Sequence, residues 1–161
     1  DVAMPGDVIL VSPGIYPERL VLRPGVTLKS VGNDAKGKIG LRRAEATVID
    51  GGGDKGTGPG VLMAEGSILD GFTVTNVGVF DEKLWAKHHA TQGNEQSHED
   101  IGKPGTAGIS VIGISECTVT NNITHHIGYT GIAIIGVEGK RVSQESVIKV
   151  PILTKAGRVG Q

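Results

Sequence analysis

The stretch GVLMAEGSILDGFTVTNVG, residues 60–78, has a counterpart further along the chain in GISVIGISECTVTNNITHHIG, residues 108–128. Each begins with a glycine and a short apolar strand, passes through a turn into a second and a third strand, and ends in a polar segment closed by glycine. GIAIIG, residues 131–136, then begins the unit again. A unit of this kind cannot bury its strand faces alone, so the repetition predicts coils that stack on one another.

The rest of the chain extends this pattern in both directions. In SVIKVPILTKAG, residues 146–157, Ile148 falls where the preceding unit has Val119. Upstream, short β-branched segments bounded by Gly, Pro or Asn occupy residues 7–12, 18–23, 26–32 and 47–51. Only residues 81–90 have a helical pattern. Three short strands per coil, with alternate apolar residues facing inward, are what an all-β parallel β-helix requires.

A two-sheet sandwich is the alternative all-β fold. It would need longer alternating strands joined by hairpin turns. The two Asp-Gly pairs of the chain, at residues 50–51 and 70–71, instead lie inside the repeating units. The β-helix, a solenoid of three-strand coils, is therefore the predicted fold.

Composition narrows the classes of function. The chain has 16 Lys and Arg against 17 Asp and Glu, a net charge of −1, which gives no electrostatic reason to expect a nucleic acid or an anionic membrane as partner. No apolar run reaches the roughly 20 residues of a membrane-spanning helix. With 26 glycines and 3% aromatic residues, the core must be built from Val, Ile and Leu. The single cysteine, Cys117, cannot form an intrachain disulfide and is expected to be buried.

Two further stretches point to a family. Residues 5–32, PGDVILVSPGIYPERLVLRPGVTLKSVG, resemble the first coil of right-handed parallel β-helix proteins of the pectate-lyase-like superfamily. ATVIDGGG, residues 46–53, and the two repeating stretches resemble its later coils. The resemblance implies a polysaccharide partner and an extracellular or periplasmic location. It also implies a fragment or short member of the superfamily, whose uncapped ends favour self-association.

The length of 161 residues fits one domain with its own core. A single right-handed β-helix is expected over residues 1–161, with coils at about 5–78 and 108–157 and one long loop insertion at 79–107.

The motifs that define activity within that superfamily are mostly absent. GIYPE, residues 14–18, matches the GxYxE string of pectin methylesterases, but the downstream aspartate and glutamine motifs of that family have no counterpart. The paired-aspartate and GHG motifs of β-helix galacturonases are also absent, and Asp50 and Asp70, each followed by glycine, are interpreted as turn residues. The resemblance implies a lyase or glycoside hydrolase acting on an acidic or plant- or algal-type polysaccharide. The alternative is a non-catalytic carbohydrate-binding or surface structural β-helix.

The insertion at residues 79–107 is the chemically richest part of the chain, and loops of this length are usually functional or disordered. One unit later the same corner is THHIGYTG, residues 124–131, so stacking is expected to bring His125, His126 and Tyr129 beside the root of the insertion. A lyase needs a base, a proton for the leaving oxygen, and a group that neutralises the substrate carboxylate, often Ca²⁺ held by oxygen ligands.

These requirements assign candidate roles to residues at this corner. Catalysis is predicted for His125, His126, Lys87 and His89. Substrate binding is predicted for Trp85, Tyr129, Lys83 and Lys103. Calcium is the cofactor to expect if there is one, with the ligands Asp81, Glu82, Glu99 and Asp100.

A transition-metal site is an alternative use of the same region. Its imidazole and carboxylate ligands would be His88, His89, His98, Glu99, His125 and His126. The spacing matches no known signature, and adjacent histidines on a strand are expected to point apart. Solvated loop residues are therefore the simpler interpretation. Asn121 and Asn122 are interpreted as a bend, because asparagine tolerates the left-handed region and bonds nearby backbone.

Overall fold

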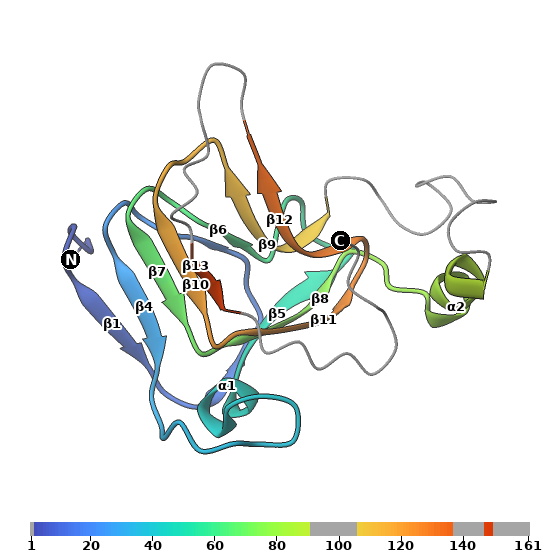
Figure 1. The fold of residues 1–161 in the computed structure, drawn as a ribbon, viewed down its shortest axis with the longest axis horizontal. Helices are drawn as coiled ribbons and strands as arrows, with labels where there is room; N and C mark the ends of the chain where they lie inside the picture. Colours follow the sequence, from blue (N-terminus) through green and yellow to red (C-terminus); the bar gives the residue numbers. More distant parts are fainter. Residues whose placement is uncertain (1, 91–105, 137–146, 150–161) are drawn as a thin grey trace.

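The computed structural model describes residues 2–90, 106–136 and 147–149. In these residues the strands form three sheets, named A, B and C here, and the chain visits them in that order once per coil (Figure 1). Neighbouring strands of each sheet are parallel. The prediction of an all-β parallel β-helix is therefore confirmed.

Each sheet takes one strand from each coil that reaches it. Sheet A contains β1 (Val8–Val11), β4 (Thr27–Ser30), β7 (Ser67–Asp70), β10 (Cys117–Thr120) and β13 (Val147–Lys149). Sheet B contains β2 (Gly14–Tyr16), β5 (Thr47–Gly53), β8 (Thr73–Val77) and β11 (Ile123–Ile127). Sheet C contains β3 (Leu20–Val21), β6 (Val61–Leu62), β9 (Ala107–Ile112) and β12 (Thr130–Ile135).

The pairing of strands follows the repeat in the sequence. Val61 of β6 pairs with Ile109 of β9, the equivalence expected from the two repeating stretches. Val119 of β10 pairs with Ile148 of β13, so the predicted alignment of the tail is confirmed up to residue 149. The remainder of the tail lies outside the described residues.

The interior of the coils is a ladder of stacked apolar side chains. Leu28, Leu69 and Val119 occupy the same level of sheet A in three successive coils, and all three are buried. Phe72, beside them in the core cluster, is 1% exposed. Cys117 is buried in the same cluster, as predicted.

Two helices interrupt the coils. α2 (Glu82–Ala90) confirms the predicted helix, and the carboxylate of Asp81 accepts hydrogen bonds from the backbone N–H groups of Lys83 and Leu84 at its start. α1 (Arg42–Ala46) has no counterpart among the predicted elements. No helix among the described residues is long and apolar enough to cross a membrane.

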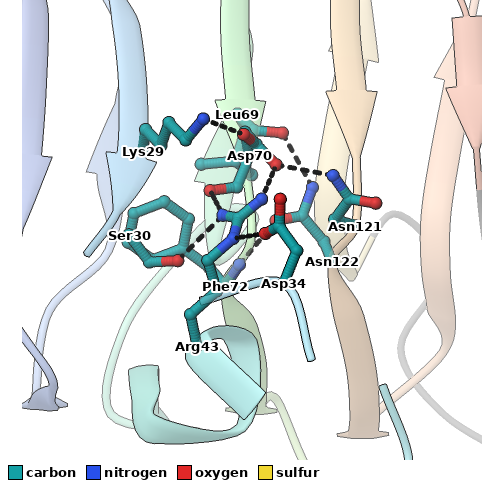
Figure 2. A network of polar contacts seen from close by, with 9 residues as sticks. All are labelled: Lys29, Ser30, Asp34, Arg43, Leu69, Asp70, Phe72, Asn121 and Asn122. Carbon is teal, nitrogen blue, oxygen red and sulfur yellow. Dashed lines mark hydrogen bonds and ion pairs between the residues drawn. The ribbon is translucent and has the colours of Figure 1, made fainter. Parts of the chain in front are cut away.

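Arg43, from α1, is 3% exposed and connects three segments of the chain (Figure 2). Its guanidinium donates to the hydroxyl of Ser30 at 3.0 Å, to the backbone carbonyl of Asp70 at 2.9 Å and to the Asp70 carboxylate at 2.6 Å. It also pairs with Asp34, and Lys29 lies 3.4 Å from the Asp70 carboxylate. Asp70 is the buried last residue of β7, so its interpretation as a turn residue is wrong.

The pKa of Asp70 records this environment. Burial alone would raise the pKa, but hydrogen bonds from Asn121 and Arg43, the charge of Arg43 and the contact with Lys29 outweigh burial and hold the pKa below its ordinary value. Above the unfolded pKa of about 3.9, the ionised Asp70 carboxylate therefore stabilises the fold fully. This stabilisation is lost as the pH falls through the lower pKa of the folded state. At neutral pH the network holds the α1 segment on the coils.

Asn121 and Asn122 form the A–B corner of the fourth coil. Asn121 has φ 57°, in the left-handed region, which confirms its predicted place in a bend. The side chain of Asn122, 4% exposed, accepts a hydrogen bond from the N–H of Phe72 at 2.8 Å and donates one to the carbonyl of Leu69 at 2.9 Å (Figure 2). The backbone groups that Asn122 bonds belong to the preceding coil, so this residue ties two coils together.

Replacing Asn122 with alanine is expected to lower the free energy of unfolding by about 2–4 kcal/mol, because it leaves one N–H and one carbonyl group buried without a partner. Chemical denaturation, followed by circular dichroism of the strands, measures the change.

Asn33→Ala is the matched control, because the Asn33 side chain accepts a hydrogen bond from the N–H of Ala35 at an exposed site. Its cost is expected to stay below about 1 kcal/mol. Equal losses in the two variants would contradict the role given to Asn122.

Candidate functional site

The outer face of sheet B carries a row of polar side chains, called the polar row here: Asp50, Thr75 and His125. They are paired across β5, β8 and β11. Because Ile49 and Val74 belong to the buried core, the residues that follow them in the strands face outward. Each member of the polar row is partly exposed. The row therefore crosses three coils at the protein surface.

A second row on the same face is covered. Val48, Thr73 and Ile123 pair with one another two residues before the polar row. The hydroxyl of Thr73 donates to the carbonyl of Ala44 in α1 at 2.8 Å, and Ile123 packs against Gly40 so closely that a Cβ on Gly40 would lie 2.6 Å from its Cδ1 atom. Helix α1 and the residues just before it thus cover this second row of sheet B and leave the polar row exposed.

His125 and His126 do not point apart as predicted. His126 has φ 52°, in the left-handed region, and it is skipped in the pairing with β8, where His125 opposes Thr75 and Ile127 opposes Val77. With His126 in this conformation, both rings lie to one side, with their Nδ1 atoms 2.6 Å apart and their ring centroids 4.8 Å apart. A non-glycine residue held in this region is uncommon and is concentrated at functional sites.

His125 is half-buried beside Thr75 of the preceding coil, and the adjacent His126 contacts the start of the insertion. Its Nδ1 atom lies 2.9 Å from the hydroxyl oxygen of Thr75. Phe80, at the root of the insertion, meets the ring of His126 edge-on with centroids 5.1 Å apart. Burial, and then the neighbouring His126, lower the pKa of His125 below its ordinary value. The imidazole is therefore neutral at neutral pH, the form that a general base requires.

Asp50, at the other end of the polar row, lies beside a glycine-rich segment, residues 51–58. Asp50 accepts hydrogen bonds from the amide of Asn76 at 2.7 Å and from the N–H of Gly52 at 2.9 Å. Asp50 lies inside β5 beside a bulge, so it is a strand residue rather than the predicted turn residue. Arg19 donates to the carbonyls of Gly51, Gly53 and Gly58, which ties the segment to the first coil.

The structure brings together only some of the predicted site residues. His126 meets the insertion at Phe80, His125 lies against His126, and Tyr129 is half-buried just before β12. Lys83, Trp85 and Lys87 lie on α2, which stands away from the three sheets (Figure 1). The side chains of His88 and His89, together with residues His98, Glu99, Asp100 and Lys103, lie outside the described part of the chain.

The predicted metal sites remain predictions. Of the proposed calcium ligands, Asp81 caps α2 with its carboxylate and Glu82 is exposed in the first turn of that helix. Within residues 2–90, 106–136 and 147–149, no group of three or more His, Cys, Asp or Glu side chains is arranged to hold a metal ion.

Sequence reasoning missed three contributors to this site. Thr75 could have been found from the repeat, since TVTNV, residues 73–77, aligns with ITHHI, residues 123–127, and places Thr75 opposite His125. The contact of Phe80 with His126 could not, because it depends on the direction in which the chain leaves β8. Asn76, at φ 54°, precedes His126 by one coil in the same left-handed position, which only the backbone reveals.

Comparison with known proteins adds a fold neighbour. No protein-family model and no curated protein sequence matches the chain. Among solved structures, the chain is similar to a pectin methylesterase from Yersinia enterocolitica, with 17% sequence identity and a TM-score of 0.42 over 70% of this chain. The chain spans 34% of the length of that structure. This similarity concerns the path of the backbone alone.

Replacing His126 with asparagine is expected to raise the pKa of His125, because it removes the neighbouring imidazole that helps to lower it. Asparagine already occupies the equivalent left-handed position at residue 76, so the backbone is expected to tolerate the change. Titration of the His125 ring followed by NMR measures the shift. A pKa that does not move would contradict the pairing of the two rings.

Acid is expected to destabilise the protein through the same residue. Since the folded pKa of His125 lies below the unfolded value of about 6.5, stability is complete above that pH and falls as the pH drops through the folded pKa. His125→Gln is therefore expected to lose less stability between neutral and mildly acidic pH than the parent protein does, as thermal unfolding at several pH values would show. An unchanged pH dependence would argue against a neutral, half-buried imidazole.

Proposed function

We propose that this protein cleaves an acidic polysaccharide by β-elimination, with His125 and His126 as its acid–base pair. The observation that carries the proposal is the paired arrangement of the two imidazoles on the open part of sheet B, with His126 in the left-handed conformation. An extracellular or periplasmic location and a polysaccharide partner belong to the same proposal, and both rest on the resemblance of the coils to pectate-lyase-like proteins.

The base is assigned to the Nε2 atom of His125. The Nδ1 atom of His125 is assigned the proton. Its N–H group then donates to the hydroxyl oxygen of Thr75 and to the Nδ1 atom of His126, which explains both short contacts. The lone pair of Nε2 is then available for the acidic proton next to the uronate carboxyl group. The lowered pKa of His125 keeps this lone pair unprotonated at neutral pH.

The pair also supplies the proton for the leaving group. When His125 takes the carbon-bound proton at Nε2, the C–H electrons form a carbon–carbon double bond and the glycosidic C–O bond breaks. The Nδ1 proton of His125 passes across the 2.6 Å contact to His126, and the Nε2 proton of His126 goes to the departing oxygen. The products are an unsaturated uronate end and a new hydroxyl end, and exchange with water restores the starting tautomers.

Elimination fits the described residues better than hydrolysis does. Inverting hydrolysis uses two carboxyl groups roughly 6.5–9.5 Å apart, and retaining hydrolysis also uses two. Asp50 is the single carboxylate of the polar row, and Asp70 is buried against Arg43. Substrate roles for Lys83, Trp85, Tyr129 and Lys87 stay predictions, as does a role for calcium.

A non-catalytic carbohydrate-binding β-helix is the second candidate. It is favoured by the scarcity of sequence motifs for any known activity. It would use the same open face of sheet B without proton transfer, so the two candidates differ in whether product forms.

Incubation with polygalacturonate, alginate and other uronate polymers, with and without Ca²⁺, is expected to release product with the ultraviolet absorbance of a conjugated double bond. His125→Gln is expected to lower the initial rate by about 10²–10⁴-fold, the usual contribution of a positioned acid or base. The binding of polymer, measured separately, should change little.

Glu116→Gln is a suitable control, because its side chain is exposed at the turn before β10. It should retain the full rate. Binding without product on every polymer would reject the lyase and leave the binding module.

A further inference from the structure

We propose that residues 36–42 form a subsite for the carboxylate groups of an anionic polysaccharide. This segment is called the cationic hairpin here. Carboxylate binding by this segment does not depend on the proposed lyase activity. Only the placement of the reacting sugar at His125 rests on that proposed function. The cationic hairpin presents Lys36, Lys38 and Arg42, and all three side chains are exposed. Within the described part of the chain, none of the three forms an ion pair within 4 Å.

The local charge is positive on a chain that is slightly negative overall. Residues 33–46 contain four cations, Lys36, Lys38, Arg42 and Arg43, and two acids, Asp34 and Glu45, which leaves a net charge of +2 against −1 for the whole chain. Both acids are already engaged. Asp34 pairs with Arg43, and the Glu45 carboxylate accepts hydrogen bonds from backbone N–H groups of the hairpin. Although the charge of Lys38 interacts with Glu45, the segment keeps its excess of two positive charges.

The hairpin is held in one shape. Lys36 and Leu41 form an antiparallel bridge, and the N–H of Gly37 donates to the carbonyl of Gly40 at 2.7 Å. The Glu45 carboxylate lies 2.5 Å from the backbone nitrogen of Ile39 and 3.1 Å from that of Gly40. Hydrogen bonds from the N–H groups of Ile39, Gly40 and Lys38, together with the charge of Lys38, outweigh burial and hold the pKa of Glu45 below its ordinary value. A preformed loop loses little entropy when it binds a ligand.

The fold places the hairpin beside the polar row. Gly40 packs on Ile123, and Ile123 precedes His125 by two residues on the same face of β11. Two residues along a strand span about 7 Å. Lys38 and Arg42 each lie two residues from Gly40 in the chain, so the hairpin brings two cations to the coil that carries His125. The Asp50 end lies two strands away, at about 10 Å.

This geometry gives the polymer a direction. Carboxylate groups are attracted to the His125 end of the polar row, where the hairpin packs, and repelled from the Asp50 end. A uronate bound with its carboxyl group toward Lys38 and Arg42 brings its acidic carbon-bound proton toward His125. The positive charge also favours the build-up of negative charge on that carboxyl group during elimination, a task otherwise expected of Ca²⁺.

The test is the affinity for polygalacturonate and for its fully methyl-esterified form, measured by affinity electrophoresis in the parent protein and in the His125→Gln background. The double variant Lys38→Gln with Arg42→Gln is expected to bind polygalacturonate roughly three- to tenfold more weakly. The loss should shrink at high salt, since the contacts are exposed. Affinity for the esterified polymer should not change.

The control is the double variant Arg23→Gln with Lys55→Gln. It removes the same two residue types from exposed positions elsewhere on the surface. Equal weakening in the two double variants would overturn the subsite, because it would show attraction by overall charge. Equal binding of polygalacturonate and duplex DNA would overturn it for the same reason. Absence of any binding to polygalacturonate would also overturn it.

The failure of this inference can be told apart from failure of the proposed function. If no polymer is cleaved but the hairpin variant selectively weakens binding, the lyase proposal fails and the subsite stands. If polygalacturonate is cleaved and the hairpin variant leaves KM unchanged, the subsite fails and the lyase stands. Thermal unfolding of each variant confirms that the exposed substitutions have not altered the fold.

Discussion

Backbone hydrogen bonding between successive coils is the constraint on which this structure depends. Each strand of a β-helix meets its partners in the coil before and the coil after, so the residue stacked above any position is fixed by the pairing of strands. A shift of the pairing register by one residue would point the core side chains outward and the polar side chains inward. The buried Asn122 and the Arg43–Asp70 pair reinforce this alignment, because each joins groups from neighbouring coils.

This constraint also explains how a site forms from residues that are far apart in the sequence. Asp50, Thr75 and His125 are separated by 25 and 50 residues, yet strand pairing sets them side by side. The α1 segment covers the neighbouring row of the same sheet and thereby limits where a polymer can lie. Chemistry at the surface is then decided by the few side chains that remain open.

Much of the fold could be predicted from the sequence because its signals are local. Glycine-bounded apolar strands recur at equivalent places, and this pattern alone predicts the stacking of Val119 on Ile148 and the burial of Cys117. The α2 helix was predictable for the same reason, since a helical stretch follows directly after Asp81. Such features depend on neighbouring residues and on one repeat.

The remaining features depend on contacts that no local pattern contains. Asp70 precedes a glycine and has the sequence of a turn, but its partner Arg43 lies 27 residues away on a helix without a clear apolar period. The two histidines lie ring to ring with His126 in a left-handed conformation, which the sequence of the strand does not reveal. Candidate chemistry at the corner was therefore visible in the sequence, whereas its arrangement was not.

The left-handed positions of Asn76 and His126 have a wider consequence. They occupy the same place in adjacent coils, so the backbone offers a repeated position that accepts different side chains while the core beneath it stays unchanged. The same backbone conformation therefore holds an asparagine in one coil and a histidine in the next. A substitution at such a position changes the surface chemistry of one coil and leaves the side chains of the neighbouring coil as they are.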